Sequence, residues 1–154
     1  MITRYKLDKA FGPVGNSAGI FLFVAGLITT YFSLTGLILA LIGAFVGFTS
    51  TSTSIDFDRK RLRFSNNIFG IIPVGQWILV QPYMVIGIKK SNNIWRAYSR
   101  SNRTLDIADN DYRLILYDYD GKEIMQLQKN NSLDAAKHHM EQLSKQLALK
   151  VSPF

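Results

Sequence analysis

The longest apolar stretch of the chain runs from Asn16 to Ser50, and its 35 residues include no charged residue and no histidine. It is longer than the roughly 20 residues that cross a membrane once. Residues 13–51 have the length of two membrane helices of about 17 to 18 residues each, joined by a tight turn. Hydroxyl side chains and Gly36 place that turn within residues 30–36. The pattern predicts a transmembrane helical hairpin, with a single tilted helix of about 30 residues as the alternative.

Basic residues flank this apolar run on both sides. Cytoplasmic flanks of membrane helices carry an excess of Lys and Arg, so a chain that enters and returns leaves both flanks on one side. We therefore expect both termini and the main domain to lie in the cytoplasm. The flanking residues are Arg4, Lys6 and Lys9 before the run, and Arg59, Lys60, Arg61 and Arg63 after it.

Small residues recur at helical spacing in the second half of the run. Helix backbones approach closely in lipid only where the contacting residues are small, so this pattern predicts a helix–helix interface. The partner is either the first helix of the hairpin, which we favour, or another membrane protein or a second copy of the chain. This small-residue ladder consists of Gly36, Ala40, Gly43, Ala44 and Gly47.

After residue 51 the apolar period changes from helical spacing to two, which is typical of strands with one buried and one wet face. Asp120 and Gly121 lie between two alternating runs and predict a two-residue hairpin turn with positive φ at both positions. About seven short antiparallel strands are expected in all. They fall in residues 55–58, 61–64, 76–80, 83–88, an uneven region at 94–107, and 112–119 and 123–128.

The last predicted element is an amphipathic helix. Ser132 or Asn131 can cap its start, and the negative charge of Asp134 in the first turn interacts favourably with the helix dipole. Pro153 lies beyond the end of the helix. Its apolar residues recur at spacings of three and four and should face the core of the β domain. That stripe consists of Leu133, Ala136, Met140, Leu143 and Leu147.

The predicted organisation has four parts. Residues 1–12 are an N-terminal segment that is either an amphipathic lead-in on the membrane surface or a frayed terminus. Residues 13–51 are the transmembrane hairpin, residues 52–150 the β domain with its final helix, and residues 151–154 a tail.

Seven short strands followed by one C-terminal helix resemble the pleckstrin-homology (PH) fold. The segments that carry the resemblance are SIDFDRKRLRFS, GQWILV, YMVIGI, YRLILYDYDGKEIMQLQ and SLDAAKHHMEQLSKQLAL. The chain is similar to bacterial PH-like domains that follow a two-helix membrane anchor. This resemblance implies a multi-pass protein of the cell inner membrane. PH-like folds host many binding functions, so the fold alone does not name a ligand.

The resemblance also implies a role for the basic cluster in the first predicted hairpin. Lipid-binding PH domains often hold basic residues there in a loose (Lys/Arg)-x-Arg pattern. Arg61 and Arg63 share one strand face and could clamp a phosphate. The favoured interpretation is general contact with an anionic membrane surface, or the positive-inside bias alone. The cluster consists of Arg59, Lys60, Arg61 and Arg63.

Candidate chemistry elsewhere is sparse. The chain has no Cys, and His138 and His139 are adjacent, so they point about 100° apart on a helix and do not form a metal site. Asp106, Asp109 and Asp111 lack the Gly and terminal Glu of a Ca²⁺ loop. Trp77 and Trp95 are expected to be core or interface anchors. The net charge of +7 is spread along the chain, and no motif indicates nucleic-acid binding.

We therefore expect a binding protein without catalytic residues, cofactor or metal. The first hypothesis is a membrane-anchored accessory or assembly subunit that docks on a larger membrane protein or forms a homo-oligomer. The alternative is a peripheral sensor that reads anionic lipid headgroups, or a peptide at a sheet edge. Membrane lipids are partners in both.

Overall fold

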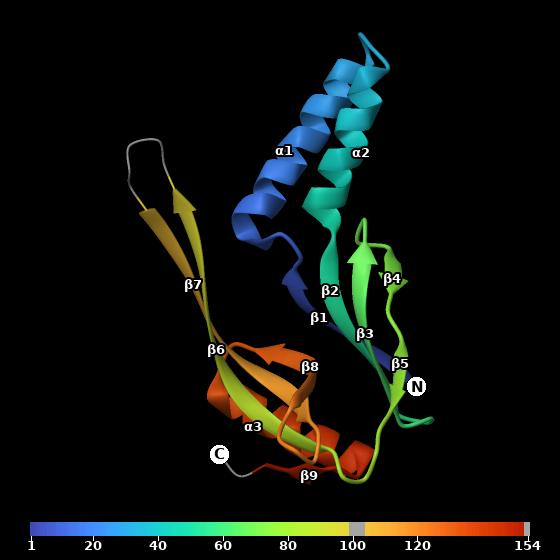
Figure 1. Ribbon diagram of the computed structural model, residues 1–154, viewed down its shortest axis with the longest axis vertical. Helices are drawn as coiled ribbons and strands as arrows, with labels where there is room; N and C mark the ends of the chain where they lie inside the picture. The colour runs from blue at the N-terminus through green and yellow to red at the C-terminus, as the bar shows by residue number, and fades with distance from the viewer. Residues whose placement is uncertain (99–103, 153–154) are drawn as a thin grey trace. The chain divides into compact units, whose positions relative to one another are not determined.

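The computed structural model describes the backbone of residues 1–98 and 104–152, and the side chains of residues 1–91 and 110–152. These residues form three helices and nine strands (Figure 1). The helices are α1 (Gly12–Thr30), α2 (Thr35–Phe48) and α3 (Leu133–Leu147). The strands are β1 (Ile2–Lys9), β2 (Ser50–Asp56), β3 (Arg61–Ile68), β4 (Ile72–Val74), β5 (Trp77–Leu79), β6 (Val85–Tyr98), β7 (Thr104–Tyr117), β8 (Glu123–Asn130) and β9 (Lys150–Val151).

The strands form two sheets. The five-stranded sheet has the order β1-β2-β3-β4, and β5 also pairs with β3. The four-stranded sheet has the order β8-β7-β6-β9, in which β6, β7 and β8 are antiparallel and β9 is parallel to β6. The prediction of a mostly antiparallel β protein that also contains helices is confirmed at this level.

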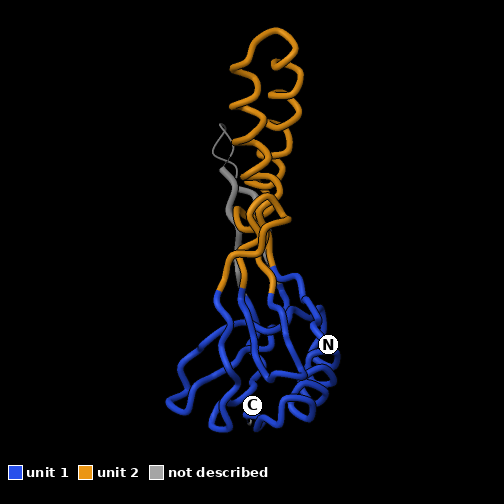
Figure 2. The backbone as a smooth tube through the Cα atoms, turned by 90° about the vertical axis from the view of Figure 1, so that its right-hand side faces the viewer, with its two compact units in different colours: residues 1–7, 53–64, 76–154 blue, residues 8–52, 65–75 orange. Residues whose placement is uncertain are grey.

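The chain divides into two compact units (Figure 2). The sheet unit contains residues 1–7, 53–64 and 76–154, and the helix unit contains residues 8–52 and 65–75. These units differ from the predicted domain boundaries at two segments of the chain. Residues 1–7 belong with the strands that follow the helices, and residues 65–75 belong with the helices that precede them.

The N-terminal segment is strand β1, so the expected amphipathic lead-in or frayed terminus is wrong. Side chains alternate along it: Arg4 and Lys6 are exposed, while Thr3 and Tyr5 are half-buried. Tyr5 packs against the core of the sheet unit. The partner strand β2 begins more than forty residues later, beyond both apolar helices. Patterns of neighbouring residues cannot predict that two strands so far apart in the sequence will pair.

Helices α1 and α2 pack antiparallel on each other through small residues. Gly19 lies against the backbone of Gly47, and a methyl group added to Gly43 would overlap the backbone of Phe23. In the structure the small-residue ladder lies against the first helix, which is the contact that the sequence analysis favours. Four of its members, Gly36, Ala40, Gly43 and Gly47, are buried, and Ala44 is half-buried. The turn at residues 31–34 lies within the predicted region.

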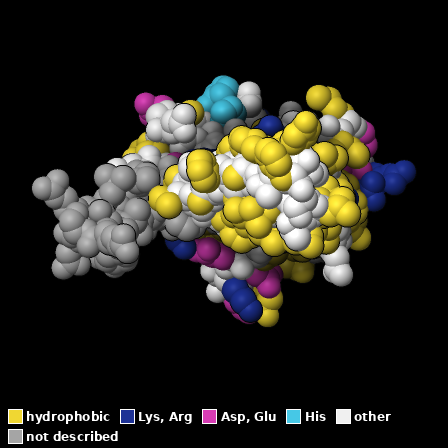
Figure 3. All heavy atoms as spheres, turned by 90° about the horizontal axis from the view of Figure 1, so that it is seen from above, with side chains coloured by type: hydrophobic (Ala, Val, Ile, Leu, Met, Phe, Trp, Pro, Cys, Tyr) yellow, Lys and Arg dark blue, Asp and Glu magenta, His cyan; other side chains and the backbone are white. Residues whose placement is uncertain are grey.

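Because glycines and alanines occupy the contact, the large apolar side chains point outward. Phe21, for example, is 76% exposed. Neither helix has a polar face, and hydrophobic side chains dominate the end of the helix pair seen in Figure 3. Among the described residues, α1 alone has the length and composition of a membrane span, and α2 is apolar but shorter.

The core of the sheet unit lies between α3 and the strands. Ile55 and Leu62 contribute from β2 and β3, Leu114 and Leu127 from β7 and β8, and Leu147 from α3. The Ser132 hydroxyl accepts a hydrogen bond from Ala135 N at 3.2 Å, which confirms the predicted cap. Ala136, Met140, Leu143 and Leu147 are buried as predicted, but Leu133 is 37% exposed.

Two further strand predictions need correction. Strand β2 has no wet face, because its consecutive residues from Ser52 to Asp56, whose side chains alternate between the two faces of the sheet, are all buried. The hairpin around Asp120 and Gly121 exists, but only Gly121 has positive φ, at +73°. The Gly121 N–H donates to Asp118 O, and the Asp118 N–H donates to Lys122 O, so a type I turn with a following bulge closes the loop.

We expect the two leucines at opposite ends of α3 to differ in their contribution to stability. Leu147 is 2% exposed and Leu133 is 37% exposed. Leu147→Ala should lower the free energy of unfolding by about 2 to 5 kcal/mol, because it leaves a cavity. Leu133→Ala, the matched control, should cost about 1 kcal/mol or less. Urea unfolding of the detergent-solubilised chain, followed by Trp fluorescence, measures both; equal losses would contradict this packing of α3.

Candidate functional site

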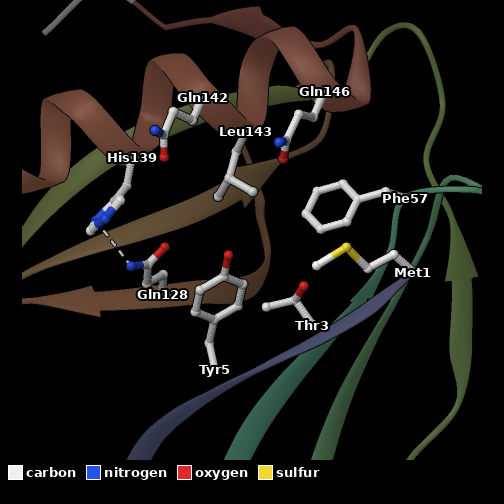
Figure 4. Close-up of a pocket in the computed structure, with 9 residues that line it drawn as sticks. All are labelled: Met1, Thr3, Tyr5, Phe57, Gln128, His139, Gln142, Leu143 and Gln146. Atoms are coloured by element: carbon white, nitrogen blue, oxygen red, sulfur yellow. Dashed lines mark hydrogen bonds between the residues drawn. The ribbon is translucent and has the colours of Figure 1, made fainter.

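A groove in the sheet unit runs between strand β1 and helix α3 (Figure 4). Its volume is ≈ 290 Å³. Strand β1 is the edge strand of the five-stranded sheet, and its alternate residues line one side of the groove. On α3 the lining residues recur at spacings of three and four, so they share one helix face. The lining consists of Met1, Thr3, Tyr5, Phe57, Gln128, His139, Gln142, Leu143 and Gln146.

One end of the groove carries a cluster of amide side chains around His139. His139 Nδ1 lies 2.7 Å from Asn130 Oδ1 and 3.0 Å from Gln128 Nε2. The shorter contact favours the tautomer in which Nδ1–H donates to Asn130. Gln128 is buried, and its Oε1 has no hydrogen-bond partner among the described residues. A buried acceptor without a donor is costly, so Gln128 leaves one unmet hydrogen-bonding group beside the groove.

The remaining lining mixes apolar surface with neutral polar groups. Figure 4 shows Met1 and Phe57 toward one end and Leu143 near the middle, with Gln142 and Gln146 projecting from α3. Burial raises the pKa of the Tyr5 phenol, so Tyr5 stays neutral and can donate or accept a hydrogen bond. The groove therefore offers amide, hydroxyl and apolar contacts, a combination that suits an extended polypeptide.

The predicted basic cluster is divided by the structure. Arg61 and Arg63 do share one face of β3, as predicted, but both guanidinium groups stack on the Trp77 ring, at 4.5 and 4.8 Å from its centroid. Arg61 Nε also donates to Asp56 Oδ2 at 2.8 Å. Arg59 and Lys60 lie in the exposed turn between β2 and β3. We call Asp56, Arg61, Arg63 and Trp77 the Trp77 cluster.

The Trp77 cluster leaves the two strand arginines with internal partners. A guanidinium group over an aromatic face gains about 0.5 to 2 kcal/mol, depending on desolvation. The hydrogen bond from Arg61 is the main reason that the pKa of Asp56 is held below its usual value, and the Arg59 backbone N–H adds to the effect. A phosphate clamp by Arg61 and Arg63 would have to compete with both partners.

The other candidate residues lie in structural pairs. Asp111, from the excluded Ca²⁺ pattern, accepts from Arg113 Nε at 2.8 Å, and both side chains are buried. His138 Nε2 lies 3.1 Å from Gln142 Nε2. Among the described residues, no group of three or more His, Asp or Glu side chains could hold a metal ion. The side chains of Trp95, Asp106 and Asp109 lie outside the described residues.

The groove itself is not apparent from the sequence. Two local signals point to it: alternation of side chains along residues 1–5, and the spacing of His139, Gln142, Leu143 and Gln146 on α3. Each signal is weak alone, because polar side chains on a helix usually face solvent. Only the placement of β1 beside α3 gives these residues a common surface.

We expect Asp56 to stabilise the sheet unit in a pH-dependent way. Its carboxylate has a lowered pKa, so its contribution is present above the unfolded value of about 3.9 and is lost as the pH falls through the folded value. Asp56→Asn should therefore be less stable than the wild type at pH 7, with a smaller difference at pH 3. Urea unfolding at both pH values measures this, with Asp120→Asn in the exposed β7–β8 loop as control. A difference that stays constant with pH would contradict it.

The chain was also compared with known proteins. No protein-family model, curated protein or solved structure matches it. The functional interpretation therefore depends on the helix unit, the groove and the Trp77 cluster.

Proposed function

We propose that this chain is a membrane-anchored, non-catalytic binding module that docks on a larger membrane protein. The observation that carries the proposal is the arrangement of the helix unit, where small residues fill the α1–α2 contact and large apolar side chains cover the outside. A water-soluble helix pair has the opposite arrangement, since its large apolar residues face inward. Lipid removes the cost of exposing those side chains.

The turn between the helices fits an apolar environment as well. Thr29 and Thr30 donate their hydroxyls to backbone carbonyls one turn earlier, at 2.8 Å in both cases. The Ser33 and Thr35 hydroxyls bond to each other at 2.9 Å. Polar groups in a bilayer need such internal partners. With 14 residues, α2 is about 21 Å long, which is short for a bilayer core of about 30 Å, so we place the pair in a locally thinned bilayer.

The basic flanks support an orientation with both ends of the helix pair on the cytoplasmic side of a bacterial inner membrane. The sheet unit supports a PH-like domain, since seven of its described strands precede α3 in the chain. Strand β1 is then the first of those seven, and the helix pair is an insertion between β1 and β2. The resemblance would thus extend over residues 1–7 in addition to the later strands.

We assign partner binding to the groove and its occupant to an extended segment of the partner protein. Edge strand β1 offers main-chain groups to a peptide strand, which is the principle of β-augmentation. The amides of Gln128, Gln142 and Gln146 complement peptide N–H and C=O groups. The alternative role, reading anionic headgroups with Arg59, Lys60, Arg61 and Arg63, is less well supported, because the Trp77 cluster engages two of these four.

We expect charges on the outer face of the helix pair to prevent stable membrane insertion. Phe21 and Leu41 are exposed near the middle of α1 and of α2. A Lys near the middle of a membrane helix costs about 2.5 to 3.5 kcal/mol. The double variant Phe21→Lys with Leu41→Lys should therefore lose the resistance to alkaline carbonate extraction that the wild type shows. The control is Tyr83→Lys with Tyr119→Lys, two exposed positions of the sheet unit. Extraction of the wild type, or retention of the helix variant, would refute membrane anchoring.

We expect a photo-crosslinking amino acid at Gln146, in the groove, to capture a membrane protein in native membranes. The same amino acid at Lys122, in the exposed β7–β8 loop, is the matched control and should give little adduct. A protein adduct from Gln146 that Thr3→Arg abolishes supports peptide binding in the groove. Adducts of equal yield from both positions would contradict it. Adducts with lipid alone would favour the headgroup-reading alternative, and adducts of doubled chain mass would indicate a homo-oligomer.

A further inference from the structure

The hairpin at residues 68–74 is a second apolar surface of the helix unit. Residues 65–75 contain no charged residue and no histidine. Ile71 is 78% exposed, Ile72 is 56% exposed, and Val74 is also exposed. Adjacent exposed aliphatic side chains on a compact unit mark an interaction surface. The membrane role of α1 and α2 does not by itself account for them.

The turn of this hairpin has an unusual sequence for its backbone. Phe69 has φ of +55° and Gly70 has φ of +72°, and the Ile71 N–H donates to Ile68 O at 3.2 Å. Positive φ is the left-handed region of backbone conformation, which Gly, Asn and Asp adopt more readily than other residues. A bulky aromatic residue is rare in this conformation. The strain at Phe69 therefore requires a compensating contact.

That contact is with the C-terminal end of α2, within the same unit. The Phe69 ring meets the Phe45 ring edge to face, with centroids 5.8 Å apart. The Phe69 N–H points to Thr49 Oγ1 at 3.4 Å. A Cβ on Gly70 would lie 3.0 Å from Phe48 O, so the turn backbone also lies close to the helix end. The hairpin is thus fixed beside the end of α2, and its aliphatic side chains are left outside.

The backbone of the hairpin suits a partly desolvated position. Strand β4 pairs with β3 through Ile68 and Ile72, and Asn67 faces Pro73. Proline has no N–H, so the free edge of β4 presents one donor fewer to its surroundings. Unpaired backbone groups are the main obstacle to placing a strand edge near lipid. The hairpin therefore combines aliphatic side chains with a reduced number of unpaired donors.

From these observations we infer that the 68–74 hairpin is an interfacial element that dips into the boundary between lipid headgroups and acyl chains, with Ile71 and Ile72 toward the lipid. The bilayer is its partner because the hairpin adjoins α2, the helix pair is apolar on all sides, and no charge interrupts the surface. This inference rests on the proposed membrane insertion of α1 and α2.

The absence of Cys allows a direct test with single labelled positions in the full chain. Ile71→Cys, Phe21→Cys and Tyr119→Cys each place an environment-sensitive NBD fluorophore at a strongly exposed position, on the hairpin, on α1 and on a sheet-unit loop. The labelled chains are reconstituted into liposomes that carry lipids with a doxyl quencher at a shallow or a deep acyl position. Exposed sites keep the fold intact, which far-UV circular dichroism verifies.

We expect the label at Ile71 to emit at shorter wavelength than the label at Tyr119, and to lose more emission to the shallow quencher than to the deep one. The label at Phe21 should be quenched within the acyl region. An Ile71 label that behaves like the Tyr119 label, while Phe21 is quenched, overturns the interfacial hairpin and leaves membrane insertion standing. An Ile71 label quenched best by the deep lipid also overturns the interfacial position. Water-like emission at Phe21 and Ile71 together overturns both proposals.

Discussion

The backbone contact between α1 and α2 is the constraint on which the helix unit depends. Gly26 lies against the backbone of Ala40, and Gly43 against that of Phe23, with no space for a side chain between them. This close approach leaves no room for large residues in the interface. Leucine, isoleucine and phenylalanine must therefore lie on the outer surface, where water would disfavour them. The membrane proposal follows from this distribution rather than from the apolar composition alone.

The sheet unit depends on a pairing that spans the helices. Strands β1 and β2 are neighbours in one sheet, and the entire helix pair lies between them in the chain. This arrangement gives the domain a strand edge at β1 beside the amphipathic helix α3. The groove exists because of that edge, since one side of it is lined by alternate residues of β1 and the other by one face of α3. The helix pair and the groove therefore both follow from this path of the chain.

Contacts within the protein decide which side chains of the basic cluster and of the 68–74 hairpin are available to a partner. Arg61 and Arg63 look available in the sequence, yet Trp77 and Asp56 occupy them. Ile71 and Ile72 lie in a stretch where the sequence predicts no strand, and they are exposed, because Phe69 fixes the turn to α2. The internal partners of Arg61 and Arg63 weaken the argument for a specific phosphate site. The contact of Phe69 with α2 leaves an apolar surface exposed on the 68–74 hairpin.

The sequence by itself determined the elements whose signals are local. The uncharged run from Asn16 to Ser50 favoured two apolar helices and a turn over one long helix, the small-residue ladder favoured a contact between them, and Ser132 with the apolar stripe predicted α3. Only the tertiary structure decided that residues 2–9 form a strand, that residues 65–75 join the helix unit, and that Gln128 and His139 line a groove. Helical periodicity and capping act over one or two turns of chain. The pairing of β1 with β2, and the groove between β1 and α3, bring together residues more than forty positions apart, and the stabilisation from these contacts appears only when those residues meet.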